Sequence, residues 1–429
     1  MGKRIVIGSF IACVACGGGN DTVGDAGLVC VAGTHACGSV CRSDSDPSAC
    51  GAACAVCSTG GGTASCLGGR CAIACAALRG DCNRDATDGC EVDLSADLSN
   101  CGACGMACAG RCIGGACDPS RVLARDVYFQ GSPLAVGSEG VYYQARNGLQ
   151  LTPLDGGRPV LLSLDGPEVL VLTKDEVIAG CQACASLDGG VAVESALYAL
   201  PRDGGSRRVL AILDGAPTAA AQVPGGVVVR ERRTDLSGGV ALVPLDGGTL
   251  TQLVTSVDSR GRSPGALAAT ADSFYYSSSD KLHFGRYDGG TAFVYANTAV
   301  SVAADATSMV FLEDSSRFLG TGGNATLWRS TTLFGFYDPL ATGLASYSQV
   351  TIGDDGIYWV SSALSDGGPG GVFRVPVDGG APARVATSRS AQPLISLSGI
   401  ALDADAVYWV DQPGDRNTVD LVLLRTPRR

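Results

Sequence analysis

From about residue 121 to the C-terminus, short apolar runs alternate with polar turns at a regular spacing. One recurring pattern is an apolar run followed by Asp-Gly-Gly, with copies ending at Gly157, Gly205, Gly248, Gly290 and Gly380 and a degenerate copy near Tyr337-Asp338-Pro339. Asp-Gly between apolar runs favours a hairpin in which both turn residues tolerate positive φ. The pattern therefore predicts pairs of antiparallel strands.

A second pattern, an apolar and aromatic run, follows a short apolar run and an acidic or glycine turn. Its clearest copies are Gly140–Tyr143, Ser273–Tyr276, Met309–Phe311, Gly356–Trp359 and Ala406–Trp409, and weaker ones are Val177–Ala179 and Val227–Val229. Each unit then reads as four antiparallel strands over about 40 to 50 residues, which is typical of a β-propeller blade. The seven copies predict an all-β fold with a propeller of about seven blades, and six or eight blades remain as alternatives.

The last unit ends at Leu421 to Pro427 and leaves no room for an outer strand. An apolar run from Arg121 to Phe129 stands before the first full unit. We expect this run to supply the missing strand and to close the ring, which removes open sheet edges.

Cysteine follows a different pattern from the repeats. The chain has 20 cysteines, and 18 of them precede residue 118, in a region that is nearly free of aromatic residues. Such a region cannot form an ordinary apolar core, so we expect disulfides to hold it together in an oxidising compartment. The cysteines expected to form bridges, in pairings that sequence alone does not give, are Cys30, Cys37, Cys41, Cys50, Cys54, Cys57, Cys66, Cys71, Cys75, Cys82, Cys90, Cys101, Cys104, Cys108, Cys112 and Cys117. Cys181 and Cys184 are expected to pair with each other and to pin a long loop of the second blade.

The N-terminus reads as an export signal. A basic start is followed by an apolar stretch from Ile5 to Ala15, too short to span a bilayer as a helix. Val14-Ala15-Cys16 resembles a bacterial lipobox, which implies that Cys16 is lipidated and becomes the new N-terminus. Cys13 is the alternative anchor, but anchoring at Cys16 leaves an even number of cysteines to pair. An ordinary cleaved signal is the other alternative.

Two resemblances concern the mature chain. Cys82-Asn83-Arg84-Asp85, Asp88-Gly89-Cys90-Glu91 and Asn100-Cys101-Gly102-Ala103-Cys104-Gly105 resemble a cysteine-rich module of large surface proteins from myxobacteria and other deltaproteobacteria. The resemblance implies an extracellular structural or adhesive role. The Tyr-Trp strands are similar to those of YWTD and NHL-like propellers, and deltaproteobacterial lipoproteins with such repeats are the nearer resemblance.

The expected organisation has four parts. They are a lipoprotein signal peptide over 1–15, a flexible tether over 16–29, a disulfide-stapled module over 30–118 and a propeller over 121–429. The stapled module is expected to contain two submodules, at about 30–81 and 82–117.

Candidate catalytic chemistry is sparse. The four C-x-x-C pairs are expected to be disulfides rather than zinc or redox sites, because the chain is exported. Only His35 and His283 are present, so neither a Ser-His-Asp triad nor a histidine metal site is expected. Asp272, Asp305, Asp355 and Asp405 recur at the same place in their units, as turn residues do. No metal or cofactor is expected. The alternatives are calcium in the axial channel and hydrolysis of the lactonase type.

Charge and loop length point to recognition. The formal net charge is −11, which disfavours nucleic acid as a partner. Arg230-Glu231-Arg232-Arg233 and Arg260-Gly261-Arg262 are the local basic segments and are expected to be solvated loops. The loops at 179–197, 313–326, 361–371 and 411–419 vary in length while the strands do not, so we expect them to bind a ligand. The predicted function is recognition of a protein, glycan or small molecule at the cell envelope, with the chain lipid-anchored at the outer membrane. A purely structural envelope protein is a further alternative.

Overall fold

The computed structural model describes residues 28–428, except for residues 109, 129–132, 185–194, 259–265, 279–280, 296–298, 315–324, 331–336, 345–348, 364–368, 389–398 and 412–420. The predicted signal peptide, most of the predicted tether and Cys16 therefore lie outside the described residues. The chain divides into two compact units, residues 1–106 and 107–429. This division falls before the boundary expected near residue 118. Within the described part of the chain, no helix has the length and apolar character needed to cross a bilayer.

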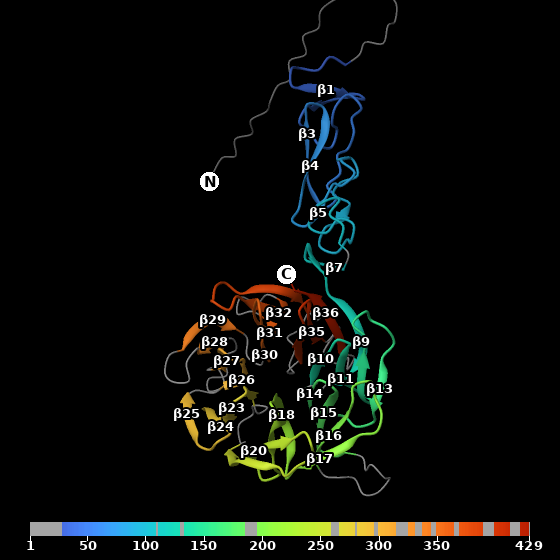
Figure 1. Ribbon diagram of the computed structural model, residues 1–429. Coiled ribbons are helices and arrows are strands. Elements are labelled where there is room, and N and C mark those ends of the chain that lie inside the picture. Colours follow the sequence, from blue (N-terminus) through green and yellow to red (C-terminus); the bar gives the residue numbers. More distant parts are fainter. Residues whose placement is uncertain are drawn as a thin grey trace, which may run out of the picture. The chain divides into compact units, whose positions relative to one another are not determined.

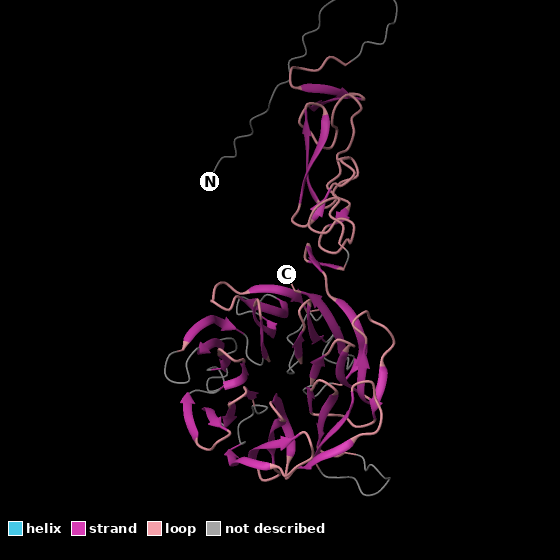
Figure 2. Ribbon diagram, in the orientation of Figure 1, coloured by secondary structure: helices cyan, strands magenta, loops and turns pink. Residues whose placement is uncertain are grey.

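The first unit consists of short hairpins joined by tight turns (Figure 2). Its strands are β1 (Thr34–Cys37), β2 (Val40–Ser43), β3 (Gly62–Leu67), β4 (Arg70–Cys75), β5 (Arg79–Gly80) and β6 (Val92–Asp93), paired as β1-β2, β3-β4 and β5-β6. Cys50, Cys57 and Cys66 form a small buried cluster. Because the cluster consists of bridged sulfur atoms, cross-links take the place of a conventional apolar core.

Disulfides follow one another along this unit with short loops. The bridges are Cys30–Cys41, Cys37–Cys54, Cys50–Cys66, Cys57–Cys71, Cys75–Cys90 and Cys82–Cys104. In the second unit Cys108 pairs with Cys117, and Cys181 pairs with Cys184. Cys101 and Cys112 are also disulfide-bonded.

The second unit opens with a hairpin of β7 (Arg111–Ile113) and β8 (Ala116–Asp118), followed by β9 (Arg121–Val127). The chain then forms seven four-stranded blades arranged in a ring (Figure 1). Blade 1 contains β10 (Leu134–Val136), β11 (Val141–Ala145), β12 (Gly148–Thr152) and β13 (Val160–Ser163). Blade 2 contains β14 (Val169–Leu172), β15 (Glu176–Cys181), β16 (Ala196–Pro201) and β17 (Arg208–Ile212). Blade 3 contains β18 (Ala216–Val223), β19 (Gly226–Arg232), β20 (Ser237–Pro244) and β21 (Thr251–Asp258).

The remaining blades repeat this order. Blade 4 contains β22 (Leu267–Ala269), β23 (Ser273–Ser278), β24 (Lys281–Arg286) and β25 (Thr291–Tyr295). Blade 5 contains β26 (Ala299–Ala304), β27 (Met309–Asp314), β28 (Ala325–Ser330) and β29 (Asp338–Leu344). Blade 6 contains β30 (Val350–Gly353), β31 (Gly356–Ala363), β32 (Pro369–Val375) and β33 (Ala383–Thr387). Blade 7 contains β34 (Ile400–Leu402), β35 (Ala406–Asp411) and β36 (Leu421–Pro427), and β9 is its fourth strand.

The ring closes through β9, as the apolar pattern predicts. The strand pairs antiparallel with β36, with Leu423 opposite Ala124 and Leu421 opposite Val127. Val127 also pairs with Ala145 of β11, so the sheets of blades 7 and 1 are joined into one. Leu123, Ala124 and Val127 are buried in the same apolar cluster as Tyr143 and Tyr408. Ring closure therefore joins segments from the two ends of the second unit.

The aromatic strands are the second strands of their blades, and they are buried on both faces because blades pack against each other. Trp359, Trp409, Tyr142, Tyr358 and Tyr408 are fully buried. Successive apolar clusters run from one blade to the next around the ring. This double burial explains why the second strands read as continuous apolar runs, while outer strands such as β13 and β33 are mostly exposed or half-buried.

The Asp-Gly-Gly segments do form turns between the third and fourth strands, but their geometry differs from the prediction. In blade 1 the N–H of Gly156 donates to the carbonyl of Pro153 at 3.0 Å, and Gly156 has a φ of 81°. The N–H of Gly157 donates to the Asp155 carboxylate at 3.0 Å. Asp155 has no positive φ, so only the glycine is left-handed. The aspartate is selected because its carboxylate accepts a hydrogen bond from the backbone two residues on.

Candidate functional site

The topology of the blades sorts their connections onto two faces. In an antiparallel blade, the connection between strands two and three lies at the same end as the link to the next blade. We call this end of the propeller the loop face and the opposite end the turn face. All four predicted binding loops connect strands two and three: β15 to β16, β27 to β28, β31 to β32 and β35 to β36. Their central residues lie outside the described residues, but the strands that carry them place all four loops on the loop face.

Under this face, second strands end in buried polar side chains, which we call the polar ring. Its described members are Gln144, Arg230, Glu231, Ser277, Glu313, Ser361 and Asp411, each at most 8% exposed. They occupy the last positions of β11, β19, β23, β27, β31 and β35, or lie close to them. The polar ring therefore replaces the aromatic layer as each strand approaches the loops.

Members of the polar ring form hydrogen bonds with neighbouring segments of the same chain. A guanidinium nitrogen of Arg230 donates to Thr218 Oγ1 at 3.1 Å. The N–H of Ala266 donates to Ser277 Oγ at 3.0 Å, and Ser388 Oγ donates to Asp411 Oδ1 at 2.7 Å. Buried polar groups require such partners. These bonds attach the second strands to inner strands and to the links between blades, and so hold the loop face in a fixed shape.

Two charged members of the ring are adjacent in β19. Burial, together with the nearby charge of Arg232, lowers the pKa of Arg230 to about 10. Burial raises the pKa of Glu231, although Arg233 donates to its carboxylate at 2.8 Å. The prediction that 230–233 is a solvated loop is wrong for these two residues, because β19 continues through Arg232 and packs against the next blade. Arg260 and Arg262 lie outside the described residues.

The recurring carboxylates lie on the turn face, in connections between first and second strands. Asp305 accepts hydrogen bonds from the N–H groups of Thr307 and Ser308, at 2.7 and 2.8 Å. Tyr358 donates to Asp355 Oδ2 at 2.7 Å. Burial raises the pKa of the Asp355 carboxyl, but hydrogen bonds from Arg428 and Tyr358 outweigh it, and the pKa lies below its usual value. These carboxylates are used within the turns, at the end of the ring opposite the predicted loops.

Other predicted residues occupy structural positions. The Cys181–Cys184 bridge is buried, at 2% and 3% exposure, beside Tyr142 and Tyr198, where the β15 to β16 loop leaves the ring. The ring of His283 in β24 stacks on Tyr276 with centroids 4.9 Å apart. His35 Nδ1 lies 2.9 Å from the Asp44 carboxylate, and its Nε2 lies 2.7 Å from the Ala49 carbonyl.

Two groups of side chains in the first unit have the spacing of metal ligands: His35, Cys37 and Cys54, and Cys50, Cys57 and Cys71. Every cysteine in both groups belongs to a disulfide. A cysteine binds a metal ion as a thiolate, which a disulfide sulfur does not offer. The proximity of these side chains therefore follows from the dense cross-linking.

No protein-family model matches this chain. No curated protein sequence matches it either. Among solved structures, it is similar to TolB from Acinetobacter baumannii, at 12% identity and a TM-score of 0.41 over 69% of this chain and 79% of that one. It is also similar to the WD40 propeller domain of Doa1, at 11% identity and a TM-score of 0.49 over 71% and 96%. The N-terminal domain of Nup159 is similar at 10% identity and a TM-score of 0.39 over 72% and 96%. The assignment of seven blades rests on the strand order of the chain itself.

Proposed function

We propose that this chain is an exported, lipid-anchored protein of the cell envelope whose propeller recognises a ligand through the loop face. The observation that carries the proposal is that the strands flanking four loops of different length all end on one face of a closed ring. Rigid frames that present variable loops on one side are a common arrangement for binding. The polar ring supports this role because it fixes the strand ends from which the loops emerge.

The loop-face proposal is tested with the full chain and an envelope fraction from the source organism. Replacing residues 185–194 and 412–420 by Gly-Ser segments of equal length is expected to reduce capture of envelope components at least about tenfold, as the loss of a few good contacts does. Quantitative mass spectrometry of the captured material measures the change.

The matched control changes the turn face instead. Asp246→Asn and Asp288→Asn alter exposed turns and should leave capture unchanged. Equal capture by the loop variant and the parent chain would place recognition elsewhere. Turnover of a lactone panel by the parent chain, together with such equal capture, would favour the hydrolase alternative.

The anchor is tested separately. Expressed in a Gram-negative host, the chain is expected to incorporate labelled palmitate, and Cys16→Ala should abolish this incorporation. Cys13→Ala is the matched control and should leave it intact. Incorporation that is lost in Cys13→Ala and kept in Cys16→Ala would move the anchor to Cys13, and no incorporation in the parent chain would indicate an ordinary cleaved signal.

A further inference from the structure

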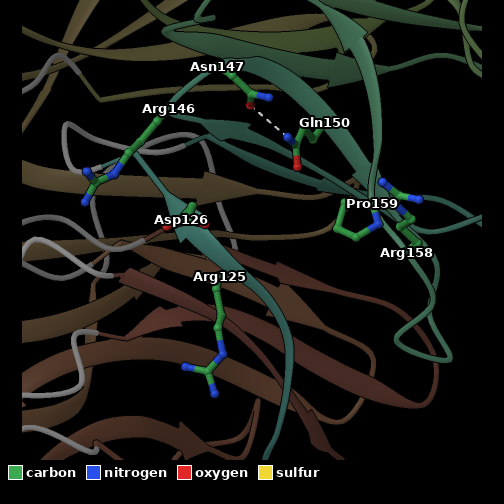
Figure 3. Close-up of a pocket in the computed structure, with 7 residues that line it drawn as sticks. All are labelled: Arg125, Asp126, Arg146, Asn147, Gln150, Arg158 and Pro159. Carbon is green, nitrogen blue, oxygen red and sulfur yellow. Dashed lines mark hydrogen bonds between the residues drawn. The ribbon is translucent and has the colours of Figure 1, made fainter.

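A cavity of about 550 Å³ lies where the ring closes, and we call it the closure groove. It is lined by Arg125 and Asp126 of β9, Arg146 and Asn147 at the turn between β11 and β12, Gln150 of β12, and Arg158 before β13 (Figure 3). Blade 7 and blade 1 thus contribute to one site. None of the residues that line the groove belongs to the four variable loops or to the basic segments singled out by the sequence pattern.

The wall of the groove is built by the closing strand. Val127 pairs with Ala145, and just before it Asp126 adopts a left-handed backbone with a φ of 62°. That conformation is costly for a residue other than glycine. The Asp126 carbonyl accepts a hydrogen bond from the N–H of Arg146 at 3.2 Å. The backbone of β9 is thereby attached to the turn that carries Arg146 and Asn147.

Amide side chains in the groove are held in place. The Tyr143 hydroxyl donates to Gln150 Oε1 at 2.7 Å, and Gln150 Nε2 donates to Asn147 Oδ1 at 2.7 Å. Because Asn147 Oδ1 accepts from Gln150, the amide nitrogen of Asn147 points away from Gln150 and is the group that can donate (Figure 3). A neutral donor therefore lies among the charged groups.

Two arginines of the groove, Arg125 and Arg158, differ in their side-chain partners from other arginines of the propeller. Arg208 and Arg374, for example, donate to Glu176 and to the backbone of Asp355. Within the described residues, the side chains of Arg125, Asp126 and Arg158 form no hydrogen bond or ion pair, and all three are exposed. In a chain of net charge −11, the groove therefore presents two guanidiniums, those of Arg125 and Arg158, against the carboxylate of Asp126.

We propose that the closure groove binds an acidic carbohydrate, a sugar chain that carries carboxylate groups. Guanidiniums pair with carboxylates through two parallel hydrogen bonds. Arg125 and Arg158 lie apart around the groove in Figure 3, which suits anionic groups on successive sugar units better than one compact anion. Asp126 accepts hydrogen bonds from sugar hydroxyls and repels a ligand that offers only anionic oxygens, such as polyphosphate. The size of the groove lies in the usual range for ligand pockets, about 300–1,000 Å³.

This proposal goes beyond recognition at the loop face and does not depend on it. The experiment uses the full chain with oligomers of uronic acid, and measures affinity by isothermal titration calorimetry at low salt. Neutral glucan oligomers of the same length and polyphosphate are the comparison ligands. The uronate oligomer should bind more tightly than either.

Arg125→Gln and Arg158→Gln are each expected to weaken uronate binding about tenfold, since each removes one charge-assisted contact. Asp126→Asn should increase the affinity for polyphosphate. The matched control is Arg286→Gln, which removes an exposed charge in blade 4 and should change affinity less than twofold. Thermal unfolding of each variant checks the fold, and Arg158→Gln keeps the test valid if Arg125→Gln disturbs β9.

Three results would overturn the proposal. Equal losses in Arg286→Gln and Arg158→Gln would show that only overall charge matters. Neutral glucan binding as tightly as the uronate would exclude the arginines as the specificity determinant, and tighter binding of polyphosphate than of uronate would exclude a sugar ligand. A loop variant restricted to residues 185–194 of blade 2 should leave uronate binding unchanged, so failure of the two proposals is distinguishable.

Discussion

Val127→Asp is expected to lower the free energy of unfolding of the propeller by about 4 kcal/mol, because it places a carboxylate in a closed apolar site. Val127 is 1% exposed and pairs with both β36 and β11. The substitution therefore weakens the strand that joins the sheets of the last and first blades. Urea unfolding followed by tryptophan fluorescence measures the change, since Trp409 of blade 7 donates to Thr426 of β36 at 3.0 Å.

The matched control for this prediction is Arg125→Asp, which introduces the same side chain at an exposed position of the same strand. It should change the free energy of unfolding by less than about 0.5 kcal/mol. If the two variants unfold at the same urea concentration, β9 does not contribute to the stability of the ring.

Reduction of the disulfides is expected to unfold the first unit and leave the propeller folded. The six bridges named above within this unit span 11 to 22 residues of sequence. Each bridge of such a length stabilises by about 3 kcal/mol, mainly by restricting the unfolded chain. Because the buried cluster of this unit consists of cysteines, no apolar core remains after reduction.

Limited trypsin digestion with and without a phosphine reductant measures this effect. Cleavage at Arg42, Arg70 and Arg79 should become rapid on reduction, while a fragment containing the propeller persists. A chain with Cys181→Ala and Cys184→Ala is the control, because it lacks the bridge of blade 2 and should give the same digestion pattern. A first unit that resists trypsin after complete reduction would show that it holds its fold without the bridges.

Local repetition explains why the blades were predictable. Five blades have an aromatic second strand and five have an Asp-Gly-Gly turn, and every blade has at least one of the two, so the sequence predicts the strands and a count near seven. The closing strand was also predictable, because a last unit without its outer strand needs one from elsewhere. The turn geometry was not, since the sequence pattern is shared by hairpin turns that differ in which residue has positive φ.

The sites were harder to predict than the fold. Arg230 and Glu231 look like part of a charged loop in sequence, and only the packing of blade 3 against its neighbour shows that they are buried. The closure groove combines residues near positions 125, 146 and 158, which no local motif links. The pairing of Cys50 with Cys66, and of Cys57 with Cys71, likewise depends on folded geometry.

The direction of β9 has a mechanical consequence. The strand runs from the turn face, where Arg121 lies opposite Arg425, to the loop face, where Val127 lies opposite Leu421. If the proposed anchor pulls on the N-terminal side and the proposed ligand holds the loop face, the load enters β9 at the turn face and is resisted at its other end. The force then acts along the strand and stretches all of its hydrogen bonds to β36 together, in shear, instead of peeling them one at a time. A propeller tethered in this way bears tension through the same strand that closes it.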